Sequence, residues 1–182
     1  MRQIRIVPHR CFPRYAYLPG RQPHPVRDPD GHSYKQETAP VNASLEAEEF
    51  LWGCDLFNHG YYWEAHEAWE GLWHALQKGD ALKDLLKALI LLSAAGVKIR
   101  EGKGAAAVRH AGRGAALLRG DRRLSGKAFA QALGSSPERI ASSAEATANN
   151  PPVLRVTALG CPEPVFAFGI GDRLNPRGTA NT

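Results

Sequence analysis

The segment Tyr61–Trp73, with the sequence YYWEAHEAWEGLW, decides the fold of this 182-residue chain. Its apolar side chains recur at steps of three and four residues, which places them on one face of an α-helix. The stripe comprises Tyr62, Ala65, Trp69, Leu72, Trp73 and Leu76. The pattern predicts a helix over residues 61–77 that buries this face against neighbouring helices.

Helical patterns continue on both sides of this segment. We expect one helix that ends at His59-Gly60, a third over residues 81–100, a fourth over 105–119, and shorter helices over 126–133 and 137–147. Asn42 or Ser44 is expected to cap the first helix and Asp80 the third. The third helix is apolar nearly all round in its middle, which is typical of the central helix of a bundle. The sequence therefore predicts an all-α protein, a compact helical bundle.

The flanking regions have a different composition. Residues 1–40 are rich in Pro and Gly and show no sustained period, so we expect an extended N-terminal arm. The bundle is expected over residues 41–148 and an irregular tail over 149–182, with its apolar stretches 153–159 and 165–168 extended over the helices.

The net charge of +5 is unevenly distributed. Residues 41–77 carry seven carboxylates and no Lys or Arg, whereas residues 98–127 carry nine basic and two acidic side chains. We expect these two segments to complement each other within the bundle or to remain solvated. The basic segment has no interleaved aromatic residues, so a small molecule or a protein is a better partner than nucleic acid.

Other sequence features favour a cytoplasmic protein. Three scattered cysteines, Cys11, Cys54 and Cys161, form no metal-binding spacing and suit a reducing compartment. The N-terminus lacks the apolar core of a signal peptide. The apolar run of residues 88–97 is about half the ~20 residues that a bilayer requires, so no membrane association is expected.

The same central segment contains the residues that suggest chemistry. His66 falls within the apolar stripe and should point toward the core, and Glu70 lies one turn further along. This i, i+4 pair can place an imidazole and a carboxylate on one metal ion. The order resembles the HExxH zinc motif with its second His replaced, which leaves Glu67 in the place of a general base. A further ligand must come from elsewhere, and His110, His24 and His32 are the imidazoles that we consider.

A non-catalytic interpretation explains the same residues. A histidine on an apolar face, flanked by carboxylates, is also typical of a buried hydrogen-bond network within a helical binding or structural module. Under this interpretation Glu64 and Glu67 are solvated or paired with the basic fourth helix. The Trp side chains, all within residues 52–73, would then be core residues.

The run Phe57-x-x-Gly60-x-Tyr62-x-Glu64-Ala-His66-Glu67-x-Trp69-Glu70-x-x-Trp73 resembles the DUF309 family of small all-helical proteins, over roughly residues 48–118. The resemblance implies a compact helical bundle. It also implies a metal-dependent hydrolase with one divalent ion such as Zn²⁺, the activity suggested for the family, although no reaction is established. One departure is Lys87, where many members have Gln. A Lys that points toward the site would repel a cation.

Overall fold

The computed structural model describes residues 4–36, 42–154 and 162–171, and within these ranges every regular element is a helix. The elements are α1 (Glu48–Asn58), α2 (Tyr62–Ala75), α3 (Ala81–Arg100), α4 (Gly104–Gly120), the 3₁₀ helix η1 (Arg122–Ser125), α5 (Lys127–Leu133) and α6 (Pro137–Asn149). The predicted all-α bundle is confirmed. The helix boundaries lie within a few residues of those expected from the periodicity.

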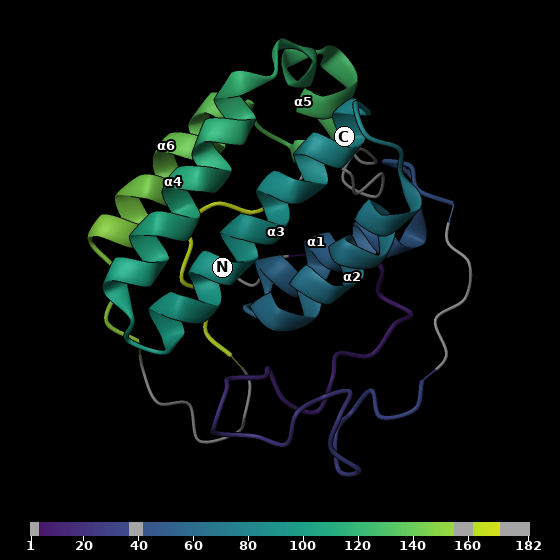
Figure 1. The fold of residues 1–182 in the computed structure, drawn as a ribbon, viewed down its shortest axis with the longest axis vertical. Coiled ribbons are helices and arrows are strands. Elements are labelled where there is room, and N and C mark those ends of the chain that lie inside the picture. Colours follow the sequence, from purple (N-terminus) through teal and green to yellow (C-terminus); the bar gives the residue numbers. More distant parts are fainter. Residues whose placement is uncertain (1–3, 37–41, 155–161, 172–182) are drawn as a thin grey trace, which may run out of the picture.

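Helix α3 is the centre of the bundle. It packs against α2 on one side and α4 on the other, while α1 covers α2 and α6 covers α4 (Figure 1). Most of its side chains are buried, as its all-round apolar pattern predicts. Asp80 caps its first turn as expected, because its carboxylate accepts a hydrogen bond from the Leu82 N–H at 2.8 Å.

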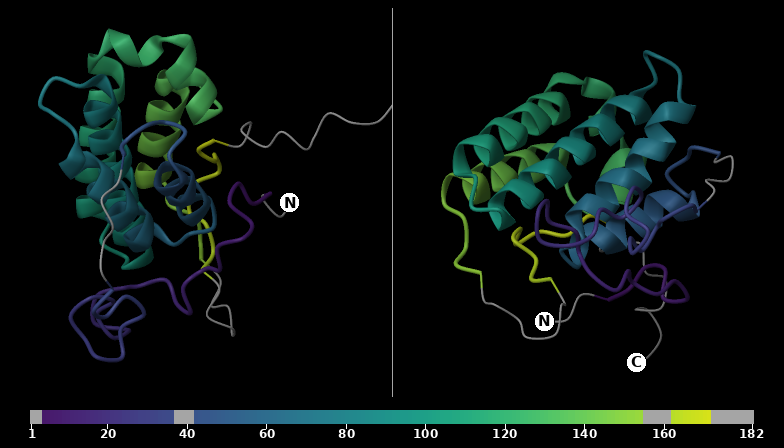
Figure 2. Two further views of the ribbon diagram at one scale, coloured as in Figure 1. Left: turned by 90° about the vertical axis from the view of Figure 1, so that its right-hand side faces the viewer. Right: turned by 60° about the horizontal axis from the view of Figure 1, so that its bottom comes forward.

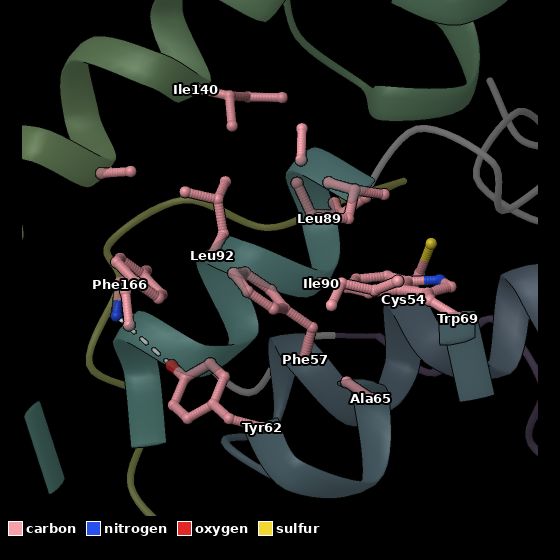
Figure 3. Close-up of a cluster of buried hydrophobic side chains, with 14 of the residues drawn as sticks. Cys54, Phe57, Tyr62, Ala65, Trp69, Leu89, Ile90, Leu92, Ile140 and Phe166 are labelled. Atoms are coloured by element: carbon pink, nitrogen blue, oxygen red, sulfur yellow. Dashed lines mark hydrogen bonds between the residues drawn. The ribbon is translucent and has the colours of Figure 1, made fainter. Parts of the chain in front are cut away.

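Two helical glycines allow the aromatic residues of α2 to approach their neighbours closely. Trp69 lies against Gly53 of α1, where an added Cβ would fall 2.2 Å from its Nε1. Tyr62 lies against Gly96 of α3, where an added Cβ would fall 2.6 Å from its Cγ. Figure 3 shows both rings in the core beside Phe57. The predicted stripe of α2 is therefore buried from Tyr62 to Leu72, whereas Trp73 and Leu76 at its end are partly buried.

The C-terminal tail lies extended against the helices, as the sequence predicts for residues 165–168. Asn58 holds it at one end, donating to the Ile170 carbonyl at 2.9 Å and accepting from the Ile170 N–H at 2.7 Å. The Tyr62 hydroxyl accepts from the Val165 N–H at 2.8 Å. Phe166 stacks on Phe57 with the ring centroids 5.4 Å apart (Figure 3). Most of the other predicted apolar stretch, residues 153–159, lies outside the described residues.

The N-terminal arm is more closely integrated than an extended segment would be. Its described part, residues 4–36, contains turns and no helix and runs along the outside of the bundle (Figure 2). Four of its side chains are nevertheless buried in the core: Val7, Ala16, Tyr17 and Leu18. The fully buried carboxylate of Asp55 accepts hydrogen bonds from the Ile6 and Val7 N–H groups, at 2.8 Å each, and from Arg5 Nε at 3.1 Å. The arm is thus part of the folded domain.

The expected cap of α1 is wrong, and of the two alternatives for the acidic segment the pairing with the basic segment is not observed. Helix α1 has Ala47 at its N-cap without a side-chain hydrogen bond, so neither Asn42 nor Ser44 caps it. Ser44 instead accepts from the Glu46 N–H in the preceding turn. The acidic segment 41–77 does not pair with the basic segment 98–127 within the described residues. Its ion pairs with Arg or Lys run to Arg5 and Arg10 of the arm.

None of the described helices is long and apolar enough to cross a membrane.

The contact between α2 and α3 can be tested by adding a methyl group. Gly96→Ala places a Cβ inside the Tyr62 ring position and is expected to cost about 1–3 kcal/mol of unfolding free energy through overpacking. Gly112→Ala in α4 faces open space and is expected to stabilise the protein by about 0.5–1 kcal/mol through helix propensity. Urea denaturation measures both values. Equal effects of the two substitutions would contradict the close contact.

Candidate metal centre

The buried stripe of α2 determines where its polar side chains lie. Tyr62, Ala65, Trp69 and Leu72 are at most 1% exposed. Trp69 fixes the rotation of the helix, because its indole Nε1 donates to the Phe50 carbonyl at 3.2 Å. His66 lies at the edge of this stripe with 29% of its side chain exposed, and not in the core as the helical wheel predicts.

Three side chains converge at this edge. His66, Glu67 and Glu70 each offer a ligand atom, and these atoms lie within 4.8 Å of one another. His66 Nε2 lies 3.8 Å from Glu70 Oε2. Around a tetrahedral zinc ion, ligand atoms lie roughly 3.4 Å apart. Side-chain rotations that bring the atoms about 1 Å closer would therefore enclose an ion.

The electrostatics of the group suit a cation. Burial lowers the pKa of His66 below its usual value, so the imidazole is neutral and can act as a ligand at neutral pH. Partial desolvation, with the nearby carboxylates of Glu70 and Glu64, raises the pKa of Glu67 to about 7. A bound cation would reduce the repulsion between these carboxylates.

Lys87 is the feature that opposes a cation. Its Nζ lies 5.1 Å from the centroid of the Trp73 ring. Burial is the main cause of the lowered pKa of His66, and the charge of Lys87 lowers it further. The charge of Glu70 acts in the opposite direction. The charge of Lys87 therefore acts on His66, as the sequence analysis considers for a Lys that points toward the site.

Two of the additional imidazoles have other partners. The His32 Nε2 lies 3.1 Å from Glu64 Oε1, and its Nδ1 lies 2.9 Å from the Ser33 hydroxyl. The His24 Nδ1 accepts from two backbone N–H groups of its own turn, at 3.3 Å each, and its ring packs on Trp63. The structure does not bring either histidine into the group of three.

His110 lies on α4 and is also outside the group of three. Its Nδ1 is buried without a hydrogen-bond partner among the described residues. Burial, followed by the charges of Arg113, Lys98, Arg109 and His66, lowers its pKa. The charge of His66 therefore acts on the pKa of His110, but His110 is not one of the three converging side chains.

Glu64 has a structural environment that the sequence does not reveal. The non-catalytic interpretation expects Glu64 to be solvated or paired with the fourth helix, but this residue is only 5% exposed. Its Oε1 accepts from the Tyr17 N–H at 2.9 Å and contacts His32, so the arm covers it. Its Oε2 is buried without a hydrogen-bond partner among the described residues. Local periodicity cannot detect this burial, because the covering residues are more than 30 positions away.

The group of three lies on an open face of the molecule. Two hollows in the surface are lined by other residues, one at Gly134–Ser136 with Arg139 and one at Asp84 with Arg123. Neither hollow includes a residue of the His66 group. Glu67 is exposed and His66 and Glu70 are partly exposed, so the group is accessible from solvent.

Comparison with known proteins gives one match. Residues 50–110, from α1 into α4, match the family model described as a domain of unknown function, DUF309. The matched range includes His66, Glu67 and Glu70. Neither the curated proteins nor the solved structures gave a match.

The raised pKa of Glu67 predicts a pH-dependent stability of the metal-free protein. A carboxyl group whose pKa rises from 4.5 to about 7 on folding penalises the folded state increasingly as the pH rises through this interval. Glu67→Gln removes the penalty and should stabilise the protein at pH 8 by about 1 kcal/mol after solvent screening, or roughly 2–4 °C in Tm. At pH 4.5 its Tm should equal that of the wild type.

Thermal unfolding in the presence of EDTA measures this difference. Glu46→Gln, at an exposed position before α1, is the control and should leave the Tm unchanged at both pH values. A Tm difference for Glu67→Gln that does not vary with pH would disprove the shifted pKa.

Proposed function

Because the chain belongs to the DUF309 family through its domain at residues 50–110, we propose that it is a metal-dependent hydrolase with its site on the surface of α2. The observation that carries this proposal is the convergence of one imidazole and two carboxylates within 4.8 Å. This donor set is one that Zn²⁺ accepts in proteins. His66 and Glu70 are the proposed ligands of a single divalent ion.

Glu67 is the proposed general base. A bound divalent ion would supply Lewis-acid polarisation and a water of lowered pKa. Glu67 adjoins His66 on the same helix and has a carboxylate within the group, so it can take up a proton from an attacking water. Its raised pKa of about 7 in the metal-free protein is near the value that favours a base at neutral pH.

His110 is the imidazole that we assign to complete the site. His24 and His32 are each engaged with groups of the arm or with Glu64. His110, in contrast, has a ring nitrogen without a hydrogen-bond partner among the described residues and responds electrostatically to His66. The remaining positions around the ion would be taken by water, as in catalytic zinc sites.

A non-catalytic binding or structural module is the second candidate function. The buried contact between Glu64 and His32 favours this second candidate, because Glu64 of the α2 motif then serves to hold the arm. The charge of Lys87 beside His66 also favours it, since this charge opposes a cation. Under this alternative the small molecule or protein partner binds without chemical change.

Metal binding by the untagged full-length protein tests the proposal. The protein purified without chelators should contain about one divalent ion per chain by elemental analysis. His66→Ala should weaken Zn²⁺ binding at least about 100-fold in competition with a chromogenic chelator, because one of few protein ligands is lost. The matched control is His74→Ala, which alters an exposed histidine in the last turn of the same helix and should bind Zn²⁺ like the wild type.

The two candidate functions predict different results. Absence of metal from the purified protein, together with equal Zn²⁺ affinity of wild type and His66→Ala, would exclude the metal centre. A Tm of His66→Ala several degrees below that of the wild type, with no effect of added metal on either protein, would support the structural alternative.

A further inference from the structure

The turn of the N-terminal arm that carries His32 joins three side chains in one chain of hydrogen bonds. Nδ1 of His32 lies 2.9 Å from the Ser33 hydroxyl, and Nε2 of the same ring lies 3.1 Å from Glu64 Oε1 on α2. A hydroxyl, an imidazole and a carboxylate in this order are the nucleophile, base and orienting group of serine-based hydrolysis. We call Ser33, His32 and Glu64 the arm triad.

The partners of the imidazole assign the hydrogen atoms of the arm triad. The side chains of His32 and Glu64 are only 9% and 4% exposed. Glu64 Oε1 also accepts from the Tyr17 N–H at 2.9 Å, so this oxygen is an acceptor and the ring hydrogen lies on Nε2. Nδ1 therefore carries the lone pair, and the Ser33 hydroxyl donates to it. Either ring nitrogen can act as a base once the other one holds the hydrogen.

The second oxygen of Glu64 favours proton transfer to the ring. This Oε2 atom is buried without a hydrogen-bond partner among the described residues. A buried carboxylate with few donors is poorly screened, so it stabilises a positive charge on the ring that it contacts. Transfer of the Ser33 proton creates such a charge on His32. Glu64 is therefore a positioning residue, which fixes the tautomer of the ring and stabilises its protonated form.

The turn holds His32 and Ser33 in a fixed arrangement. The Ser33 N–H donates to the Pro25 carbonyl at 3.0 Å, and a Cβ added to Gly31 would fall 2.3 Å from the same carbonyl oxygen. The Tyr15 ring packs on the imidazole with the ring centroids 4.7 Å apart, and its hydroxyl accepts from the His32 N–H at 3.4 Å. The arm runs along the outside of the bundle (Figure 2), and Ser33 is partly exposed. Ser33 is thus accessible from solvent while its partners are buried.

We propose that Ser33 is the nucleophile of a second hydrolytic site, which acts on carboxylic esters and shares no residue with the candidate metal centre. His32 is its general base, and Glu64 orients that base. The observation that carries this proposal is the unbroken chain of hydrogen bonds from a partly exposed hydroxyl to a buried carboxylate. Esters are the substrate class, because their alcohol leaving groups need less assistance than the amines of amides.

The reaction proceeds through an acyl-enzyme. Ser33 Oγ forms a bond to the carbonyl carbon while its proton passes to Nδ1 of His32. The ester C–O bond breaks, and the leaving oxygen takes that proton and departs as an alcohol. A water molecule then attacks the acyl carbon and gives one proton to Nδ1. The bond between this carbon and Oγ breaks, the serine recovers the proton, and a carboxylic acid is released.

Covalent labelling of the full-length, EDTA-treated protein with a fluorophosphonate probe tests the arm triad. The serine oxygen bonds to phosphorus, fluoride leaves, and the serine proton passes through His32 to solvent. The probe is expected on Ser33, located by peptide mass spectrometry, and Ser33→Ala should remain unlabelled. His32→Gln should react at least about 100-fold more slowly, because the general base is lost. The matched control is Ser44→Ala, which removes another partly exposed hydroxyl from a turn and should react like the wild type.

Glu64→Gln tests the positioning role. The amide keeps an oxygen that can accept from the Tyr17 N–H, but the negative charge is lost. Labelling of Ser33 should therefore slow at least about tenfold in protein that circular dichroism shows to be folded. A purely structural Glu64 would change the Tm and leave the labelling rate of the folded protein unchanged.

The absence of label on Ser33 of the folded wild type would overturn the inference, and so would equal labelling rates of the wild type and His32→Gln. Hydrolysis of 4-nitrophenyl acetate by the wild type, lost in Ser33→Ala and kept in Ser44→Ala, would support it. Because EDTA removes divalent ions, these results do not depend on whether His66 binds a metal.

Discussion

Asp55 brings a carboxylate into the core of the bundle, where every one of its hydrogen bonds comes from the N-terminal arm. A buried carboxylate without such donors would cost several kcal/mol, so the arm and α1 must fold together. Asn58 and Tyr62 impose the same requirement on the tail, whose backbone groups they bind at Ile170 and Val165. Polar side chains of the first two helices therefore hold both irregular ends of the chain.

Glu64 and Glu67 of the motif on α2 have different roles as a result. Glu64 faces the arm and is buried beneath Tyr17 and His32, whereas Glu67 is exposed beside His66 and Glu70. Two carboxylates one helical turn apart thus have opposite environments. Glu64 holds the arm in place, and its charge contributes to the raised pKa of Glu67. The fold and the candidate chemistry are coupled through this pair.

The sequence predicts the features that depend on local periodicity. The α2 stripe, the central position of α3 and the Asp80 cap follow from spacing and capping rules, and the structure confirms them. The same rules locate His66, Glu67 and Glu70 within one turn of a helix. They place His66 too deep, because they do not show how far the neighbouring helix covers the edge of the stripe.

The features that the sequence does not predict depend on contacts between distant residues. Glu64 is covered by His32, and the Asp55 carboxylate is bound by the backbone at Ile6 and Val7. No period or motif in a Pro-rich arm indicates which buried acceptor it binds. The alternative that the acidic and basic segments pair is not observed among the described residues, since Arg5 and Arg10 of the arm pair with Asp55 and Glu49 instead.

The effect of saturating Zn²⁺ on the Tm of Glu64→Ala and Glu70→Ala tests this division most directly. Glu64→Ala should unfold roughly 2–10 °C below the wild type without metal, because Tyr17 and His32 lose their acceptor, yet it should keep the wild-type shift on adding Zn²⁺. Glu70→Ala removes a proposed metal ligand and should lose most of that shift. A Zn²⁺ shift that disappears in Glu64→Ala and persists in Glu70→Ala would contradict the account.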